Sequence, residues 1–510
     1  SGIEQDVIWV GTDDGRVHIT RDGGTNWESL EGRVRGGPDN PWVSTIFASP
    51  HDASVAFITL DNHRNGDMGT YAYRVSNYGR TWTSITTDEI SGYAASILQD
   101  AEDPDLLFLG TEFGLYISLN GGRSWTKWIE GVPTVQIADI VQQTRESDII
   151  LGTHGRAAFV IEDVSALRGL STGAFNQRFQ LLDVSDAQQY RPSQTPSSRF
   201  PGSGEFRAEN APYGAMITFV ASGADLPHPD DMTERERKIA ARTSSSDEEA
   251  APETPKITVE VRDSSGSLIR TFKADVHQGI NRVMWDLARD GLMPVDADDA
   301  PKDGTLPRGR EVVPGTYQIT ARFEDAEASG ETVVLADPRS TYSLADHQAN
   351  DAFRAEIQTQ SERLNTALLQ IVAARRDISS IETLISERKR LQSISAEDED
   401  HPLNVLTKQA GEVKEALNEV EKRFRVPPET KGIVYESDKA STILFRADFY
   451  AGSTYDAPSE AARLELANAE EALDSAITEL NTILSGDLVE LRTAMLEEGI
   501  DLLDQSPVTE

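Results

Sequence analysis

The stretch Ser118-Leu119-Asn120-Gly121-Gly122-Arg123-Ser124-Trp125 decides the fold of the first third of the chain, because it is repeated. Equivalent stretches run from Thr20 to Trp27 and from Val75 to Trp82, and all three approach the pattern Ser/Thr-x-Asp-x-Gly-x-Ser/Thr-Trp. Asn replaces Asp in the second and third copies, and Val75 and Asn26 also depart from the pattern. A repeat of this kind indicates one supersecondary unit that is used several times.

The physical role of the repeated stretch is to close a tight hairpin. An Asp or Asn side chain caps backbone N–H groups of the turn, a Gly takes the positive φ, and the Trp folds back to bury the turn against the sheet. We therefore assign the positions of the repeated pattern to folding rather than to chemistry. They are Thr20, Asp22, Gly24, Trp27, Asn77, Gly79, Trp82, Ser118, Asn120, Gly122 and Trp125.

A second repeated element is a Gly-Thr pair at the end of an apolar run, found at Gly11-Thr12, Gly110-Thr111 and Gly152-Thr153. Successive turn Trp residues are 55 and 43 residues apart, which suits four-stranded β-propeller blades. Residues 1–171 are therefore predicted to form three blades and a closing strand. Propellers need about four to eight blades, and open blades leave strand edges bare. We expect an N-terminal segment or another chain to complete the ring, with assembly of several copies as the alternative.

The repeated turns resemble the Asp-box, or BNR, repeat of sialidases, sortilin-like receptors and two-propeller xyloglucanases. The segments 61–67 and 152–164 also resemble blades of large bacterial proteins known as sortilin-like or BNR-repeat glycosyl hydrolases. This resemblance extends over essentially all of the chain and implies that it corresponds to the C-terminal half of such a protein. It also implies an extracytoplasmic location in a bacterium: secreted, periplasmic or at the cell surface.

The middle of the chain, residues 213–337, is predicted to be an immunoglobulin-like β-sandwich, because short alternating runs are separated by turn residues. Its motifs at 279–286 and 314–317 resemble those of the FlgD-type domain. Residues 172–212, rich in Gln, Ser, Pro and Arg, predict an extended connector. Residues from about 224 to 256 predict a disordered acidic insert.

Two kinds of residue in this region invite a functional interpretation. Trp285 and Tyr317 are assigned to the core, with sugar stacking by Trp285 as the alternative. Asp296, Asp298 and Asp299 lack the ligand spacing and the following Gly of a calcium loop, so we expect them to be solvated.

The last third, residues 338–510, has the apolar period of helices. Three amphipathic helices are predicted, with stripes running from Phe353 to Ile385, from Leu406 to Phe424 and from Leu473 to Leu491. Their lengths favour an up-and-down α-helical bundle; stripes that face a partner are the alternative. The predicted fold class is thus multi-domain: all-β propeller blades, then an immunoglobulin-like sandwich, then a helical bundle.

Composition excludes several classes of function. The 510 residues include 48 Lys and Arg, 85 Asp and Glu and no Cys, and the formal net charge is −37. A field this negative disfavours nucleic acids and anionic membrane surfaces as partners. Without Cys there is no disulfide framework, Cys-ligated zinc or thiol nucleophile. No apolar run is long enough for a transmembrane helix. The eight His lack metal-ligand spacing, so neither a metal nor a cofactor is expected.

Candidate ligand-binding residues are the polar residues that follow the Gly-Thr pairs or the corresponding position of the second blade, because ligands bind at propeller mouths and loops. They are Asp13, His63, Arg64, Glu112, His154 and Arg156. The alternative for His154 and Arg156 is that they hydrogen-bond neighbouring blades. No G-x-S-x-G, H-E-x-x-H or P-loop motif occurs, so no catalytic residue is assigned.

Two functions follow from these observations. The first is a non-catalytic binding and assembly protein that recognises protein or glycan partners. The second, implied by the family resemblance, is a propeller-type glycoside hydrolase, sialidase- or xyloglucanase-like, with catalytic carboxylates partly in the missing blades. A hydrolase needs two carboxylates that face each other across the scissile bond, and the sequence cannot select a pair among 85 acidic residues.

Overall fold

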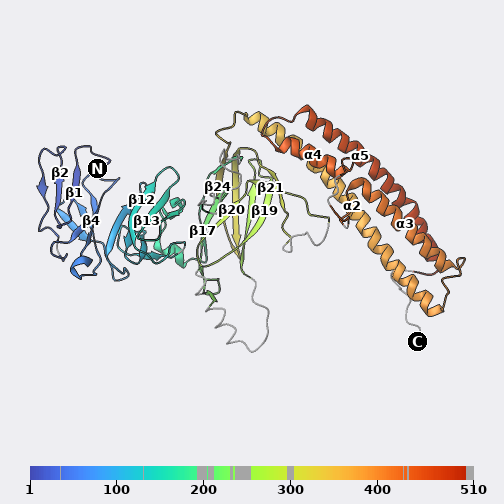
Figure 1. The fold of residues 1–510 in the computed structure, drawn as a ribbon, viewed down its shortest axis with the longest axis horizontal. Helices are drawn as coiled ribbons and strands as arrows, with labels where there is room; N and C mark the ends of the chain where they lie inside the picture. Colours follow the sequence, from blue (N-terminus) through green and yellow to red (C-terminus); the bar gives the residue numbers. More distant parts are fainter. Residues whose placement is uncertain are drawn as a thin grey trace.

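The computed structural model describes residues 1–34, 36–129, 131–191, 204, 212–229, 234–235, 254–295, 304–428, 430–432 and 436–500. These residues form a series of antiparallel β-sheets followed by C-terminal helices, as the sequence predicts. The arrangement is elongated, with the first sheets at one end, the helices at the other and two further sheets between them (Figure 1). Most of the predicted acidic insert, part of the predicted connector and Asp296, Asp298 and Asp299 lie outside the described residues.

The first third of the chain forms four sheets, each a meander of neighbouring antiparallel strands. The strands are β1 (Ile8–Gly11), β2 (Val17–Thr20) and β3 (Glu28–Ser29); β4 (Trp42–Ala48), β5 (Ala56–Asp61), β6 (Tyr71–Ser76) and β7 (Thr81–Ser84); β8 (Ala94–Gln99), β9 (Leu107–Thr111), β10 (Gly114–Ser118) and β11 (Thr126–Trp128); and β12 (Ile137–Gln143), β13 (Asp148–Thr153) and β14 (Ala158–Ile161). The prediction of three blades and a closing strand was one sheet short. The expected closing strand, β13, pairs with β12 on one side and β14 on the other.

Successive sheets pack face to face through three separate apolar cores. The first strands of the second and third sheets also contact the next sheet through hydroxyl groups: Ser44 Oγ donates to the Ala94 carbonyl at 3.1 Å, and Ser96 Oγ donates to the Ile137 carbonyl at 3.0 Å. Strands β4, β8 and β12 share a register shift near their starts. Such a bulge re-aims a side chain, and here it places the hydroxyls at the boundary between sheets.

The repeated turns connect the last two strands of the first, second and third sheets. Asp22 Oδ1 accepts the Asn26 N–H at 2.8 Å, and Asn120 Oδ1 accepts the Ser124 N–H at 3.0 Å. Trp125 is 4% exposed and donates its indole N–H to the carbonyl of a residue in the preceding sheet's final segment. Trp27, expected to be buried in the same way, is 46% exposed. The difference arises because no described sheet precedes the first one.

The middle of the chain contains two sheets that share one core. One has the order β15 (Phe179–Val184), β17 (Ala215–Ala221), β20 (Gly279–Trp285); the other has β16 (Ala187–Gln188), β24 (Ala326–Leu335), β23 (Gly315–Phe323), β18 (Lys256–Arg262), β19 (Leu268–Asp275). A separate ribbon pairs β21 (Ala288–Asp290) with β22 (Arg308–Glu311). Trp285 and Tyr317 are buried, and their rings lie 5.1 Å apart.

Two strands of these sheets, β15 and β16, lie within the predicted connector. Phe179, Val184 and Ala187 anchor them in the shared core. The sequence did not predict these two strands, because polar residues around each strand dominate the local composition. The short 3-10 helices η2 (Ser165–Leu167) and η3 (Thr172–Asn176) precede them and link the fourth sheet to β15.

The last third contains α2 (Leu344–Gln392), α3 (Pro402–Phe424), α4 (Ala440–Gly452), α5 (Glu460–Ser485) and α6 (Asp487–Glu497), which share one apolar core. The prediction of three helices was therefore too low for the described residues. Helix α4 is short and was overlooked, and the third predicted helix is divided at Gly486, so that Leu488 and Leu491 belong to α6. Among the described residues, no helix is both long and apolar enough to span a membrane.

Candidate functional site

The six candidate residues predicted from the sequence lie in four equivalent turns. Each turn follows the second strand of a full meander, or its counterpart β1 in the first sheet, so the antiparallel order places all four turns at the same end of the stack. The repeated Trp-containing turns lie at the opposite end. The residues predicted from the sequence therefore all lie at one end of the stacked sheets. Their side-chain contacts show which of them come together there.

His63 is the best-anchored candidate. It lies in η1 (His63–Asn65), and its Nδ1 is 2.6 Å and 2.8 Å from the two carboxylate oxygens of Asp61, a buried residue at the end of β5. The imidazole also stacks on Tyr93, with ring centroids 4.4 Å apart. A carboxylate so placed accepts the Nδ1–H and leaves Nε2 as the acceptor of the neutral ring.

Glu112 and Arg64 lie beside this pair. The Glu112 N–H donates to the Tyr93 carbonyl at 3.1 Å, and burial, then the charges of Glu112 and Asp61, raise the pKa of Tyr93. Arg64 stacks over the exposed Trp42 ring, 4.9 Å from its centroid. We call this region the turn-end surface; it consists of Trp42, Asp61, His63, Arg64, Tyr93, Glu112 and the exposed Phe113.

The other three candidates do not join the turn-end surface through side chains. Asp13, His154 and Arg156 are exposed, and within the described ranges their side chains form no hydrogen bond, ion pair or ring contact. Their turns are held by other groups: the His154 N–H donates to the Gln136 carbonyl at 3.0 Å, and the Arg156 N–H donates to Thr153 Oγ1 at 3.2 Å.

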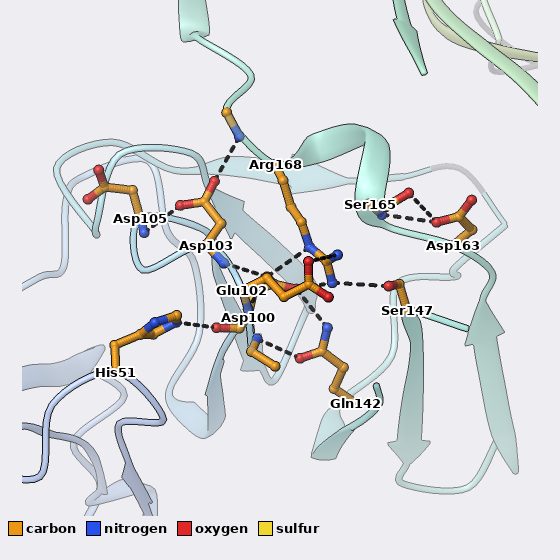
Figure 2. A network of polar contacts seen from close by, with 12 residues as sticks. His51, Asp100, Glu102, Asp103, Asp105, Gln142, Ser147, Asp163, Ser165 and Arg168 are labelled. Carbon is orange, nitrogen blue, oxygen red and sulfur yellow. Dashed lines mark hydrogen bonds and ion pairs between the residues drawn. The ribbon is translucent and has the colours of Figure 1, made fainter. Parts of the chain in front are cut away.

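The opposite end of the stack carries a buried polar network that joins three sheets (Figure 2). Asp100 is fully buried and accepts hydrogen bonds from Arg168 Nε at 3.0 Å, Arg168 Nη2 at 3.2 Å and Gln142 Nε2 at 2.6 Å. Its carbonyl oxygen lies 2.8 Å from a ring nitrogen of His51, in the second sheet. Every member has a structural partner, so this network fastens the sheets rather than presenting a free reactive group.

A cavity of about 860 Å³ lies next to this network, between the fourth sheet and β15 and β17. Its walls are acidic, and two of their carboxylates share a serine. Ser185 Oγ donates to Asp163 Oδ2 at 2.7 Å and lies 3.4 Å from Asp183 Oδ2. Burial, then the negative charge of Asp163, raise the pKa of Asp183.

The backbone at Asp163 is unusual, with φ of 43°, in the left-handed region that non-Gly residues seldom adopt. Two guanidinium N–H groups of Arg282 donate to the carbonyls of Glu162 and Asp163, and the Asp163 N–H donates to Asp148 Oδ1 at 3.0 Å. These contacts hold the Asp163 side chain toward Ser165 and Ser185.

Neither Asp163 nor Asp183 was singled out from the sequence. Asp163 follows the fourth sheet and Asp183 lies in β15. Only the fold brings them together, so no local spacing could have revealed the pair. Asp61 could have been found from the local sequence, because it ends a strand two residues before His63. At this separation an Asp side chain can accept a hydrogen bond from the backbone of the turn that follows. No group of three or more His, Asp or Glu within the described residues is arranged to hold a metal ion.

Comparison with known proteins adds little to this geometry. No family model matches the chain. No curated protein matches it either. Among solved structures, YCF48 bound to D1 peptide aligns at 14% identity with a TM-score of 0.24, over 36% of this chain and 54% of that one.

Two further structures belong to glycoside hydrolase group GH74. The Niastella koreensis GH74 enzyme aligns at 14% identity with a TM-score of 0.26, over 64% of this chain and 47% of that one. An ancestral GH74 enzyme aligns at 14% identity with a TM-score of 0.26, over 65% and 39%. All three neighbours are β-propeller proteins. This chain spans about half or less of their lengths, and TM-scores this low carry no argument about its function.

Proposed function

We propose that the chain is a binding and assembly protein built on an incomplete β-propeller, and that further sheets from a partner segment or chain pack against the outer faces of its four-sheet stack. The observation that carries the proposal is that surfaces which are buried between internal sheets are exposed on the terminal sheets.

On the first sheet, the exposed surface surrounds the repeated turn. In the second and third sheets, the turn glycines Gly79 and Gly122 pack so closely on Leu30 and Ile85 of the preceding sheet that a Cβ would lie 2.4 Å and 2.8 Å from them. A Cβ at the equivalent Gly24 would meet only the ring of its own Trp27. The first turn therefore has the shape of an interface whose other half lies outside the described residues.

On the fourth sheet, the exposed surface is a row of apolar side chains that crosses all three strands. Val141 pairs with Ile150, and Ile150 pairs with Val160; all three are exposed, Val160 to 57%. In the third sheet the corresponding row is buried against the fourth. It consists of Leu98, Phe108 and Ile117, which are 3%, 0% and 5% exposed. The same position in the repeat is thus a sheet-packing surface in one copy and an open surface in the next.

An exposed apolar row of this kind is typical of a protein interaction surface. A further antiparallel sheet of the same type is the occupant that fits, because the third sheet shows how such a row is covered. The turn-end surface would provide recognition of a protein or glycan, since exposed Trp42 and Phe113 offer stacking faces beside the polar His63 and Glu112.

The proposal includes a division of the chain and a place of action. Residues 1–171 would be the propeller blades with Asp-box turns, 172–212 a connector that contributes two strands to the next unit, 213–337 an FlgD-type immunoglobulin-like sandwich and 338–510 an α-helical bundle. An extracytoplasmic bacterial location fits the net charge of −37, which favours solubility, and the resemblance of the repeated turns to those of exported proteins.

Site-specific photo-cross-linking tests the assembly. The full chain, with benzoylphenylalanine at Val160, is produced in its source cells and irradiated, and the products are mapped by mass spectrometry. We expect cross-links to a β-strand segment outside residues 1–510. The matched control is Leu268, an equally apolar and exposed strand residue of the middle sheets, which should give no such product.

Two results would contradict the assembly proposal. Cross-links from position 160 that map only within one copy of residues 1–510 would show that the row is covered internally. Cross-links to a second copy, together with concentration-dependent association in sedimentation velocity, would establish a ring of identical chains instead of a partner.

A second candidate function is glycoside hydrolysis, favoured by the Asp163–Asp183 pair. Two carboxylates that share one hydroxyl in an open cavity match the need for an ionised and a protonated carboxyl group on either side of a glycosidic bond. Asp183, with its raised pKa, would be the acid and Asp163 the base or nucleophile. Hydrolysis of a polysaccharide panel that is lost in Asp183→Asn and kept in Asp186→Asn would support it; no hydrolysis by the wild type would exclude it for the isolated chain.

A further inference from the structure

We propose that the junction between the middle sheets and the helices binds a hydroxylated carboxylic acid of the hexuronate class. A cavity of about 330 Å³ lies there, bounded by the ribbon strand β22, by Tyr190, Arg191 and Tyr213, and by α2 and the end of α4. A small polar pocket next to it shares Arg191, Glu311 and two other residues of the wall. The larger of these two cavities shares Tyr190 and Tyr213 with the 860 Å³ cavity, but Asp163 and Asp183 line neither of them.

The charge of this cavity is opposite to that of the protein. Three guanidinium groups and one carboxylate line it, whereas the whole chain carries a net charge of −37. Arg308 Nε lies 2.9 Å from an Asp286 oxygen, and Arg354 Nε lies 2.7 Å from an Asp448 oxygen. Because Arg308 and Arg354 are paired with these carboxylates, the guanidinium that remains to attract an anionic ligand is that of Arg191.

Arg191 is the guanidinium that is free to bind such a ligand. Within the described ranges it forms no ion pair, and its buried Nε has no hydrogen-bond partner. It is held in place by other means: its guanidinium stacks over the Tyr455 ring, 4.3 Å from the centroid, and its Nη2 donates to the Thr454 carbonyl at 3.4 Å. A planar guanidinium with free N–H groups matches the two oxygens of a carboxylate.

Groups that recognise hydroxyls lie on the other walls and in the small adjoining pocket, which His347 lines although it does not line the larger cavity. Glu311 accepts the Tyr213 hydroxyl and has further acceptor capacity. His347 is 95% buried, stacks on Tyr455 at 4.7 Å and has no hydrogen-bond partner for Nε2 among the described residues. Burial lowers the pKa of His347, so the ring is neutral near pH 7 and offers Nε2 to a ligand hydroxyl.

These features together select one class of ligand. A single unpaired guanidinium neutralises one carboxylate, whereas Glu311 opposes the second charge of a phosphate dianion. Arg191 Nε and His347 Nε2 lack hydrogen-bond partners and can bind ligand hydroxyls. The tyrosine rings supply flat apolar faces for a sugar ring. The cavity lies at the lower end of the size range of small-molecule sites, which suits one monosaccharide unit.

Isothermal titration of the full chain with D-glucuronate and D-galacturonate tests this inference, with D-glucose, D-galactose and inorganic phosphate as comparison ligands. We expect at least one uronate to bind and the neutral sugars to bind on the order of 10- to 100-fold more weakly, because a charged hydrogen-bonded contact is lost. Arg191→Gln should weaken uronate binding by a similar factor. The matched control is Arg463→Gln, which removes a guanidinium that stacks over Phe353 outside the cavity and should leave binding unchanged.

A melting curve accompanies each variant, and Arg308→Gln provides a second test if Arg191→Gln fails to fold, because Arg308 lies on the cavity wall with a half-exposed side chain. The inference is wrong if neither uronate binds the wild type, if glucose binds as tightly as glucuronate, or if Arg463→Gln weakens binding as much as the cavity variants. Equal binding of phosphate would show a general anion site and overturn the assignment to uronates.

Discussion

Replacing Asp100 by Asn should loosen the junction of the second, third and fourth sheets. The two carboxylate oxygens of Asp100 accept different hydrogen bonds. Oδ1 accepts those from Arg168 Nε and from the backbone N–H groups of Glu102 and Asp103. Oδ2 accepts those from Arg168 Nη2 and Gln142 Nε2. An Asn can keep the Oδ1 contacts. Its amide nitrogen, in the place of Oδ2, would then face two N–H donors with no acceptor between them.

The expected cost follows from burial and charge. Asp100 is fully buried, and the Arg168 side chain is 16% exposed. Breaking a buried ion pair by removing one charge costs about 3–5 kcal/mol. Glu102, 2.8 Å from Arg168 Nη1, compensates part of the charge that is left, so we expect a loss near the lower limit, about 3 kcal/mol.

Native-state hydrogen exchange across a urea series measures this loss locally, because peptides from β8, β9, β12 and β13 report the opening of the third and fourth sheets. The matched control is Glu102→Gln, which removes the other carboxylate partner of Arg168. The Glu102 side chain is 64% exposed, and a solvent-exposed pair contributes about 0–1 kcal/mol. Peptides from the distant helix α3 should keep their protection in both variants.

The reasoning is refuted if Asp100→Asn costs less than about 1 kcal/mol or no more than Glu102→Gln. The pH dependence gives an independent check. Burial acts to raise the pKa of Asp100, but Arg168, the two backbone N–H groups and Gln142 outweigh it, and the net shift is downward. The stabilisation is therefore complete above the unfolded value, about 3.9, and is lost as the pH falls through the lower folded value.

Two further substitutions test other contacts. Gly79→Ala should destabilise the junction of the first and second sheets by about 1–3 kcal/mol, because φ is 89° and the new Cβ would lie 2.4 Å from the buried Leu30 side chain. Thermal melting compares this variant with Gly32→Ala, where φ is also positive but nothing lies within 4 Å of the new Cβ. Equal losses of stability in the two variants would contradict the packing argument. Glu421→Gln should lower the stability of the helical region by about 3–5 kcal/mol, because this buried carboxylate pairs with two arginines at 2.6 Å and 2.9 Å. The test is urea unfolding followed by circular dichroism at 222 nm, and an unchanged urea midpoint would disprove the prediction.

The sequence predicted those parts of the fold that rest on local pattern. The repeated turn and the Gly-Thr pair located the sheets, and the period of the stripe from Phe353 to Ile385 predicted α2 over most of its length. The missed elements have weak local signals: β16 has two residues, and α4 exposes Phe445 and Phe449, so that its pattern differs from that of an ordinary amphipathic helix.

The candidate sites divide in the same way. His63, Arg64 and Glu112 were found because each follows the end of a strand in the repeat. Asp163 and Asp183 meet only because η2 and η3 turn the chain from the fourth sheet toward β15. No spacing rule could have predicted their shared contact with Ser185, and the same holds for Arg191 and Glu311 at the helix junction, which are 120 residues apart.

The hydroxyl contacts between neighbouring sheets give the stack a direction. Thr45 and Ser96 follow the bulges of β4 and β8, and each donates forward to a carbonyl of the next sheet. The same position after the β12 bulge is Asp139, which has a carboxyl group in place of the hydroxyl and accepts the Ile140 N–H at Oδ1. Under the proposed assembly, a further sheet would pack best with an N–H, a hydroxyl or a cation at this point, unlike the carbonyls that the third and fourth sheets present to Thr45 and Ser96. Asp139 thus makes the outer face of the fourth sheet chemically different from the boundaries between the earlier sheets.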